Sequence, residues 1–139
     1  MEIVTTSAKE TKDLGAKLAR SLKGGDVLAL YGDLGSGKTT FTQGLAQALG
    51  IKQRIVSPTF VIYKKYKILN HIDCYRLENS DDLTGIDLDE IMGDPTAITI
   101  IEWPERIESL LPKDAVKIRF ETVDEKTRRI VVERFIRES

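Results

Sequence analysis

The residues from Gly32 to Thr39 read Gly-Asp-Leu-Gly-Ser-Gly-Lys-Thr and fit the pattern G-x-x-x-x-G-K-[S/T] at every specified position. Glycines in such a loop let successive backbone amides point inward and bind an anion, which a Cβ would obstruct. Lys38 can then contact the β- and γ-phosphates of a nucleotide, and the Thr39 hydroxyl can ligate Mg²⁺. The pattern predicts a loop that binds the phosphates of a nucleoside triphosphate.

A magnesium ion at such a loop needs a further acidic ligand, held directly or through water, at the carboxyl end of a neighbouring strand. Two carboxylates follow apolar residues in positions that fit this role. Glu102 ends the run Ala97–Ile101, and Asp73 follows Ile72. Glu102 is the better candidate because its run is continuously apolar and predicts a central strand. Asp73 stays open as the alternative ligand.

Other polar residues allow a chemical and a structural interpretation. The segment Ser57–Phe60 either carries a hydroxyl that senses the γ-phosphate through Mg²⁺ or forms a proline turn that enters a strand. His71 is expected to be a packed core residue, because the chain has no second His and only Cys74 to complete a zinc site. The basic segment Lys64–Lys67 predicts a solvated strand face rather than an RNA contact.

Hydrophobic periodicity predicts the elements that position these residues. Val27–Tyr31 is a short apolar run, typical of a strand buried on both faces. Phe41, Leu45 and Ala48 recur at helical spacing after the glycine loop. The order strand, glycine loop, helix is the context that the phosphate-binding pattern requires.

Further elements complete the predicted fold. An S-x-x-E capping box at Ser7 begins a helix that carries a leucine stripe and stops at Gly24–Gly25. The β-branched and aromatic residues of 54–77 predict two adjoining strands or a hairpin, with Asn70 as the only turn-type residue among them. Alternation over 116–135 predicts a second hairpin with one solvated face. We therefore expect an α/β, P-loop NTPase fold in a single domain over residues 1–139, whose mixed sheet has parallel core strands, antiparallel additions and helices on both faces.

The composition argues against two classes of protein. The chain has 21 Lys and Arg residues against 22 Asp and Glu, a net charge of −1, so no global positive field attracts a polyanion and a dedicated nucleic-acid binder is not expected. No apolar run approaches the roughly 20 residues that span a bilayer. The N-terminus carries charge from Glu2 onward without an apolar signal segment. We expect a cytoplasmic protein without a membrane partner.

Four motifs in order, GDLGSGKTTF, SPTF, HIDCYRL and IEWPERI, resemble the bacterial TsaE (YjeE) family of small P-loop ATPases from about Ser7 onward. The resemblance implies Mg²⁺-dependent ATP hydrolysis in support of N6-threonylcarbamoyladenosine formation in tRNAs that read codons beginning with A. It implies a TsaD–TsaB heterodimer as the protein partner, which performs the transfer and which the ATPase resets between cycles. Contact with tRNA would then be indirect, through that complex.

The resemblance also implies roles for single residues. Thr39 and Glu102 would ligate Mg²⁺, and Lys38, Asp73 and Glu102 would be the catalytic residues, with Asp73 at a family position implicated in hydrolysis. Trp103 would lie near the nucleotide or the partner surface, with ordinary packing as the alternative. The ATP-binding set would be Gly32, Asp33, Gly35, Ser36, Gly37, Lys38, Thr39, Thr40 and the switch residue Thr59.

Three other functions are alternatives to an ATPase for a chain with this phosphate-binding loop. A small-molecule kinase needs an arginine-bearing lid, and the basic residues here do not gather in one insertion. A GTPase normally shows N-K-x-D, which the chain lacks. A nucleotide-dependent scaffold with negligible turnover stays open, because no arginine finger or water-positioning Gln stands out and Arg76 and Arg106 are only candidates. Since such a finger contributes about 10³ to 10⁵ in rate, we expect weak intrinsic hydrolysis that a partner raises.

Overall fold

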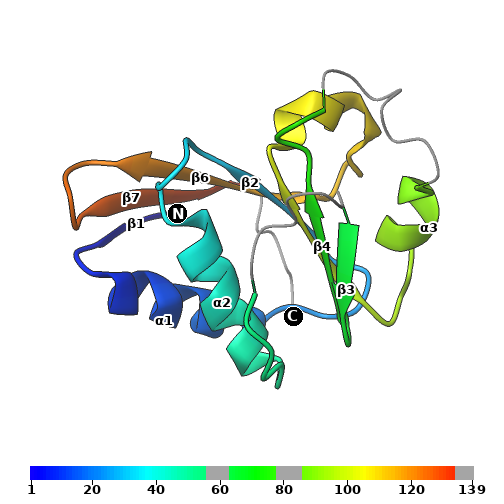
Figure 1. The fold of residues 1–139 in the computed structure, drawn as a ribbon, viewed down its shortest axis with the longest axis horizontal. Helices are drawn as coiled ribbons and strands as arrows, with labels where there is room; N and C mark the ends of the chain where they lie inside the picture. The colour runs from blue at the N-terminus through cyan, green and yellow to red at the C-terminus, as the bar shows by residue number, and fades with distance from the viewer. Residues whose placement is uncertain (56–62, 78–85, 134–139) are drawn as a thin grey trace.

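The computed structural model describes residues 1–55, 63–77 and 86–133. Within these residues, seven strands form one sheet in the order β1-β7-β6-β2-β5-β4-β3 (Figure 1). The elements in chain order are β1 (Glu2–Thr5), α1 (Ala8–Ala19), β2 (Val27–Tyr31), α2 (Lys38–Ala48), β3 (Tyr63–Tyr66), β4 (Leu69–Asp73), α3 (Leu88–Met92), β5 (Ile98–Glu102), the 3₁₀ helix η2 (Pro104–Leu110), β6 (Val116–Thr122) and β7 (Arg128–Glu133).

The centre of the sheet is parallel and its two sides are antiparallel. β2 pairs in parallel with β5 and β6, and β4 pairs in parallel with β5. β7 pairs antiparallel with both β6 and β1, and β3 pairs antiparallel with β4. This arrangement confirms the predicted mixed sheet.

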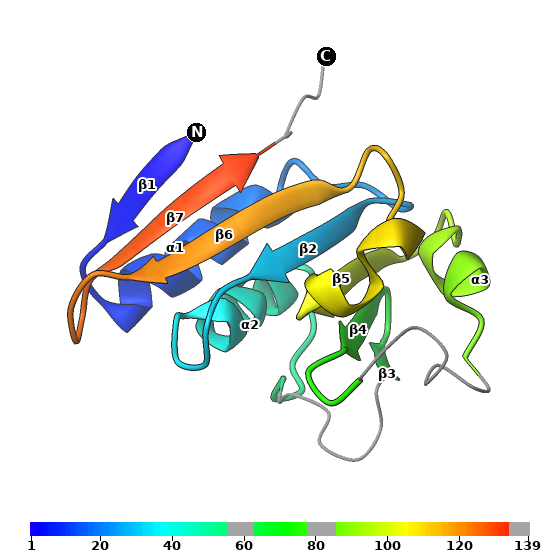
Figure 2. The same cartoon turned by 90° about the horizontal axis from the view of Figure 1, so that it is seen from above.

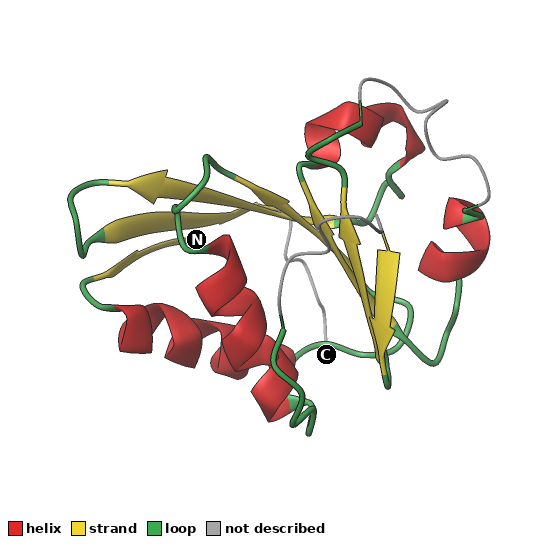
Figure 3. Cartoon of the chain, in the orientation of Figure 1, coloured by secondary structure: helices red, strands yellow, loops and turns green. Residues whose placement is uncertain are grey.

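Helices cover both faces of the sheet. α1 and α2 lie on one face, and η2 and α3 lie on the other (Figure 1, Figure 2). Because β2 is central and covered on both sides, all five of its residues are buried: Leu28 and Leu30 pack in the cluster with α1 and α2, and Val27 packs in the cluster with α3. Figure 3 shows the helical and extended segments in two colours. The predicted α/β fold class is confirmed.

The two helices on the first face approach each other closely. α1 and α2 meet at glycines, and a Cβ built on Gly44 of α2 would lie 2.9 Å from the Cα of Lys12 in α1. A Cβ on Gly15 would lie 3.0 Å from the backbone nitrogen of Leu45. The first turn of α2 carries Lys38 and Thr39, so this contact fixes the helix that presents the phosphate-binding residues.

One helix end and one strand differ from the sequence-based prediction. The N-terminal helix ends at Ala19, several residues before Gly24–Gly25, because the Ser21 amide and hydroxyl both turn back to the Leu18 carbonyl, at 3.0 and 3.1 Å. The strand β1 was not predicted, because its four residues carry no apolar alternation strong enough to mark a strand. Pairing with β7 creates it.

The turn of the β3–β4 hairpin also lies elsewhere than its composition suggests. Lys67, with a φ of +53°, forms the turn together with Ile68. Asn70 is instead buried inside β4, where its Oδ1 accepts a hydrogen bond of 3.0 Å from the Tyr63 hydroxyl. A hydrogen bond to a residue of the neighbouring strand therefore overrides the usual preference of Asn for turns.

Candidate nucleotide-binding site

The glycine loop connects the end of β2 to the start of α2. Gly37 caps α2 with a φ of +105°, a backbone conformation that glycine adopts without strain. At Gly32 a Cβ would lie 2.7 Å from both the Phe120 carbonyl oxygen and the Ser36 Oγ. The Ser36 amide donates to the Asp33 carbonyl at 3.1 Å and closes a turn inside the loop. The glycines of the motif are thus required by local geometry.

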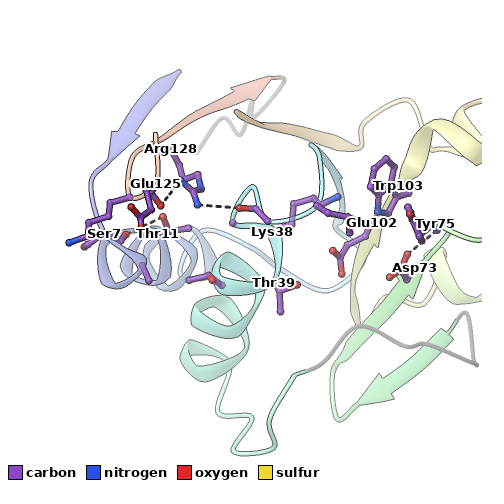
Figure 4. A pocket seen from close by; sticks show the side chains of 16 residues that line it. Ser7, Thr11, Lys38, Thr39, Asp73, Tyr75, Glu102, Trp103, Glu125 and Arg128 are labelled. Carbon is purple, nitrogen blue, oxygen red and sulfur yellow. Dashed lines mark hydrogen bonds between the residues drawn. The ribbon is translucent and has the colours of Figure 1, made fainter. Parts of the chain in front are cut away.

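A pocket of about 630 Å³ opens beside this loop (Figure 4). Its walls come from the N-terminus of α1, the loop and first turn of α2, the ends of β4 and β5, and the turn between β6 and β7. The lining residues are Ser7, Ala8, Thr11, Leu34, Gly35, Gly37, Lys38, Thr39, Thr40, Asp73, Tyr75, Glu102, Trp103, Glu125, Lys126 and Arg128.

Lys38 extends from the first turn of α2 toward the ends of β4 and β5 (Figure 4). The residue is only 4% exposed. Its Nζ donates a hydrogen bond to the Gly32 carbonyl and lies 4.1 Å from the centroid of the Trp103 ring. Burial lowers the pKa of Lys38, while the carboxylates of Glu102 and Asp73 oppose that shift. A cation is therefore held inside the pocket against its desolvation cost.

The two predicted acidic residues lie side by side at the carboxyl ends of β4 and β5. Asp73 and Glu102 are register partners on these parallel strands, so their side chains project from the same face. Glu102 is buried, and its Oε2 lies 2.6 Å from the Nε2 of His71. Asp73 is partly exposed, and its Oδ1 accepts the Tyr75 amide at 2.9 Å. Burial raises the pKa of Asp73, and the nearby Glu102 carboxylate adds to this effect.

Trp103 forms part of the pocket wall directly after Glu102. Its φ of +56° is rare for a bulky residue and turns the chain sharply into η2. The indole ring lies 5.0 Å from the Tyr75 ring, measured between centroids. Trp103 also packs against the core cluster that contains Ile101 and Ile107, so both interpretations given for Trp103 above stay open.

The structure brings most of the predicted site residues into one place. Seven line the pocket: Gly35, Gly37, Lys38, Thr39, Thr40, Asp73 and Glu102. Gly32, Asp33 and Ser36 line a second hollow, on the other side of the loop. Thr59 lies outside the described residues.

One wall of the pocket was missed by the sequence-based analysis. This wall combines residues from distant parts of the chain: the N-cap residue Ser7 and Thr11 of α1, Lys126 of the β6–β7 turn, and Arg128 at the start of β7. Arg128 donates a hydrogen bond of 3.2 Å to the Gly35 carbonyl. No local motif marks these residues, because strand pairing through β1, β7 and β6 brings them together.

His71 is both a core residue and a contact of the site. The ring is fully buried, as predicted. Its contact with Glu102 was not predicted, although the alternation of His71 and Asp73 along one strand face was a usable signal.

The donor set fits a triphosphate and Mg²⁺. Gly35 and Gly37 have left-handed backbone, a Cβ on Gly35 would meet only open space, and Lys38 lines the same pocket. The Thr39 hydroxyl and the carboxylates of Asp73 and Glu102 are hard oxygen donors, which Mg²⁺ prefers. Among the described residues, no group of three or more His, Cys, Asp or Glu could hold a metal alone. Magnesium at a nucleotide site typically shares one or two carboxylates with phosphate oxygens, which this set matches.

A buried parallel strand, a glycine loop, a helix that begins at the lysine, and carboxylates at the ends of the neighbouring strands together define a P-loop protein. A family model described as "Threonylcarbamoyl adenosine biosynthesis protein TsaE" matches residues 5–130. The chain belongs to the TsaE family, which confirms the resemblance seen in its motifs.

Individual relatives agree with this assignment. The TsaE protein of Bacillus subtilis is 42% identical over 118 residues, which cover 82% of this chain and 73% of that protein. The TsaE protein of Treponema pallidum is 38% identical over 135 residues, covering 95% of this chain and 99% of that one. A crystal structure of Bacillus subtilis YdiB superposes with a TM-score of 0.79 at 37% identity, over 94% of this chain and 82% of that chain.

Over residues 1–55, 63–77 and 86–133, the helices are too short or too polar to cross a bilayer.

Proposed function

We propose that this chain is a Mg²⁺-dependent ATPase that supports N6-threonylcarbamoyladenosine formation in tRNA together with a TsaD–TsaB complex. The observation that carries the proposal is the convergence of Lys38, Thr39, Asp73 and Glu102 on one pocket beside the glycine loop. The relatives from Bacillus subtilis and Treponema pallidum are both named tRNA threonylcarbamoyladenosine biosynthesis protein TsaE, which supports the pathway.

Each of these residues has a distinct part in hydrolysis. The loop amides and Lys38 would hold the phosphates, and the Thr39 hydroxyl and Glu102 would hold Mg²⁺. When bound, Mg²⁺ neutralises charge on the phosphates. Asp73 would orient the attacking water and accept its proton, because burial raises the pKa of this carboxyl and makes it a better base.

The wall opposite the acidic residues would bind the nucleoside. Ser7 supplies a hydroxyl and Arg128 a cation on the side of the pocket away from Asp73 and Glu102 (Figure 4). Lys126 also lines the pocket and supplies a second cation. A triphosphate whose terminal phosphate lies near the acidic residues directs its nucleoside toward this wall. In this arrangement the reacting phosphate would lie beside Lys38 and Asp73.

The positions of the arginines support weak ATP hydrolysis by the isolated chain. Neither of the two arginine-finger candidates, Arg76 and Arg106, lines the pocket, and both are exposed. Arg128 does line it, but its guanidinium donates to backbone carbonyls, including those of Asp124 and Gly35. We propose that a partner supplies the missing stimulation, and a scaffold with negligible turnover is the alternative outcome.

The test combines calorimetry of ATP binding with phosphate release, measured with and without TsaD–TsaB. Lys38→Ala should abolish high-affinity binding of ATP, whereas Glu102→Ala should lower turnover more than binding, because the metal stabilises charge that develops during transfer. Glu90→Ala removes an exposed carboxylate on α3 that lines neither the pocket nor the second hollow, and serves as the matched control.

Three results would count against parts of the proposal. A wild-type chain that takes up no purine triphosphate would refute the nucleotide site. Equal rates with and without TsaD–TsaB would refute stimulation by that complex and favour the scaffold. Full hydrolysis by Glu102→Ala would transfer the metal-ligand role to Asp73.

A further inference from the structure

The proposed metal ligand Glu102 is held from the neighbouring strand by His71. We propose that His71 is a positioning residue, which fixes the Glu102 carboxylate in the orientation that receives the divalent cation. This inference rests on the proposed function and adds to it a residue that touches neither nucleotide nor metal.

The sheet places the two side chains on one face. On the parallel pair β4 and β5, His71 is opposite Ile100, and Asp73 is opposite Glu102. Residues two apart on a strand share a face, so His71, Asp73 and Glu102 all project toward the side covered by α1 and α2, where Ile100 packs. Glu102 reaches back diagonally across the sheet to the imidazole.

The hydrogen bond between these residues is short and shielded from water. The distance from His71 Nε2 to Glu102 Oε2 is 2.6 Å, and the side chains are 0% and 4% exposed. A carboxylate that ligates a cation only accepts hydrogen bonds, so in the proposed metal-binding form Nε2 would carry the hydrogen. In a dry environment such a charge-assisted bond strongly restricts the orientation of the carboxylate.

A purely structural role explains the pair poorly. Removing a carboxylate and an imidazole from water costs desolvation free energy, and a protein with apolar residues of similar size at such a site is often equally stable or more stable. The Nδ1 of His71 has no hydrogen-bond partner among the described residues, so the ring is anchored at the Glu102 side. Residues that support a metal ligand in this way typically change metal affinity about 10- to 100-fold when removed.

Three variants separate the donor from the bulk of the ring. The amide nitrogen of Gln reaches about as far as Nε2, whereas that of Asn reaches only as far as Nδ1. His71→Gln therefore keeps a donor toward Glu102, His71→Asn moves it away, and His71→Leu removes it. The Gln and Asn variants are both polar amides, so their comparison does not depend on whether the Leu variant folds.

The measurement is Mn²⁺ binding, followed by the loss of the free-ion EPR signal, in the full chain with a non-hydrolysable ATP analogue. We expect His71→Leu and His71→Asn to weaken Mn²⁺ binding about 10- to 100-fold. His71→Gln should stay within about threefold of wild type, because it keeps the donor, and the analogue measured without metal should bind all variants alike.

Two results would overturn the role of His71 alone: equal Mn²⁺ affinity in wild type and His71→Leu, or equal affinities of the Gln and Asn variants. Failure of the proposed function looks different, because the wild-type chain itself would then bind no Mn²⁺ with the analogue. A structural role would lower thermal stability in all three variants without separating Gln from Asn.

Discussion

The crossing of α1 and α2 at Gly15 and Gly44 gives a sharp test of how the phosphate-binding helix is held. Gly44→Ala adds one methyl group at the point where α2 meets the backbone of α1. The new Cβ would lie 2.7 Å from the carbonyl carbon of Lys12 and 2.9 Å from its Cα. Non-bonded carbon atoms pack at about 3.5–4.0 Å, so the helices must separate by roughly 1 Å.

Two opposing effects set the magnitude. Alanine favours the helix over glycine by about 1 kcal/mol. Overpacking costs about 1–3 kcal/mol and sometimes more, and here the neighbour is backbone, which cannot rotate away as a side chain can. The Lys12 carbonyl oxygen lies closer to the new Cβ than either carbon, which puts the overpacking cost at the upper end of its range. We therefore expect the clash to outweigh helix propensity, with a net loss of about 2 kcal/mol in the free energy of unfolding.

Urea denaturation measures this loss, and ATP calorimetry measures its effect on the site. The affinity for ATP should fall as well, because α2 carries Lys38 and Thr39 in its first turn. Gln47→Ala, on the exposed side of the same helix, is the matched control and should change stability by about 0.5 kcal/mol or less. A Gly44→Ala chain at least as stable as wild type would show that propensity dominates and refute the packing argument.

Further predictions concern single groups in and near the pocket. Burial raises the pKa of Asp73, so ionisation of this carboxyl lowers folding stability as the pH rises above the ordinary value of 3.8. Asp73→Asn should therefore raise the free energy of unfolding, measured in urea, at pH 7 and raise it less at pH 4. An equal change at both pH values would contradict the raised pKa. Burial raises the pKa of Cys74 to about 12. Ellman's reagent should therefore react at pH 8 at least about 100-fold more slowly with the native chain than with the urea-unfolded chain. Similar rates for the two states would argue against burial of the thiol. ATP binding should draw the Lys38 ammonium away from the face of Trp103 and so change the fluorescence of this residue, the only tryptophan of the chain. The Lys38→Met variant should show little fluorescence change when ATP is added. Unchanged emission of the wild-type chain at saturating ATP would refute the movement of Lys38.

The sequence alone predicted the phosphate-binding loop, and the reason is that its chemistry is local. Eight consecutive residues contain the glycines, the lysine and the hydroxyl, and the apolar run Val27–Tyr31 before them is typical of a buried strand. Glu102 and Asp73 were found for a related reason, since each directly follows an apolar residue, Ile101 or Ile72, at the end of a strand. Their roles in catalysis remain predictions.

Tertiary structure decided which distant residues share the pocket. Strand order places Asp73 beside Glu102 and His71 against its carboxylate, and the β1–β7–β6 pairing carries Arg128 to the loop. The short edge strand β1 and the burial of Asn70 likewise depend on partners far along the chain. Contacts of this kind leave no periodicity in the sequence, because they are set by which strands become neighbours rather than by the residues on either side.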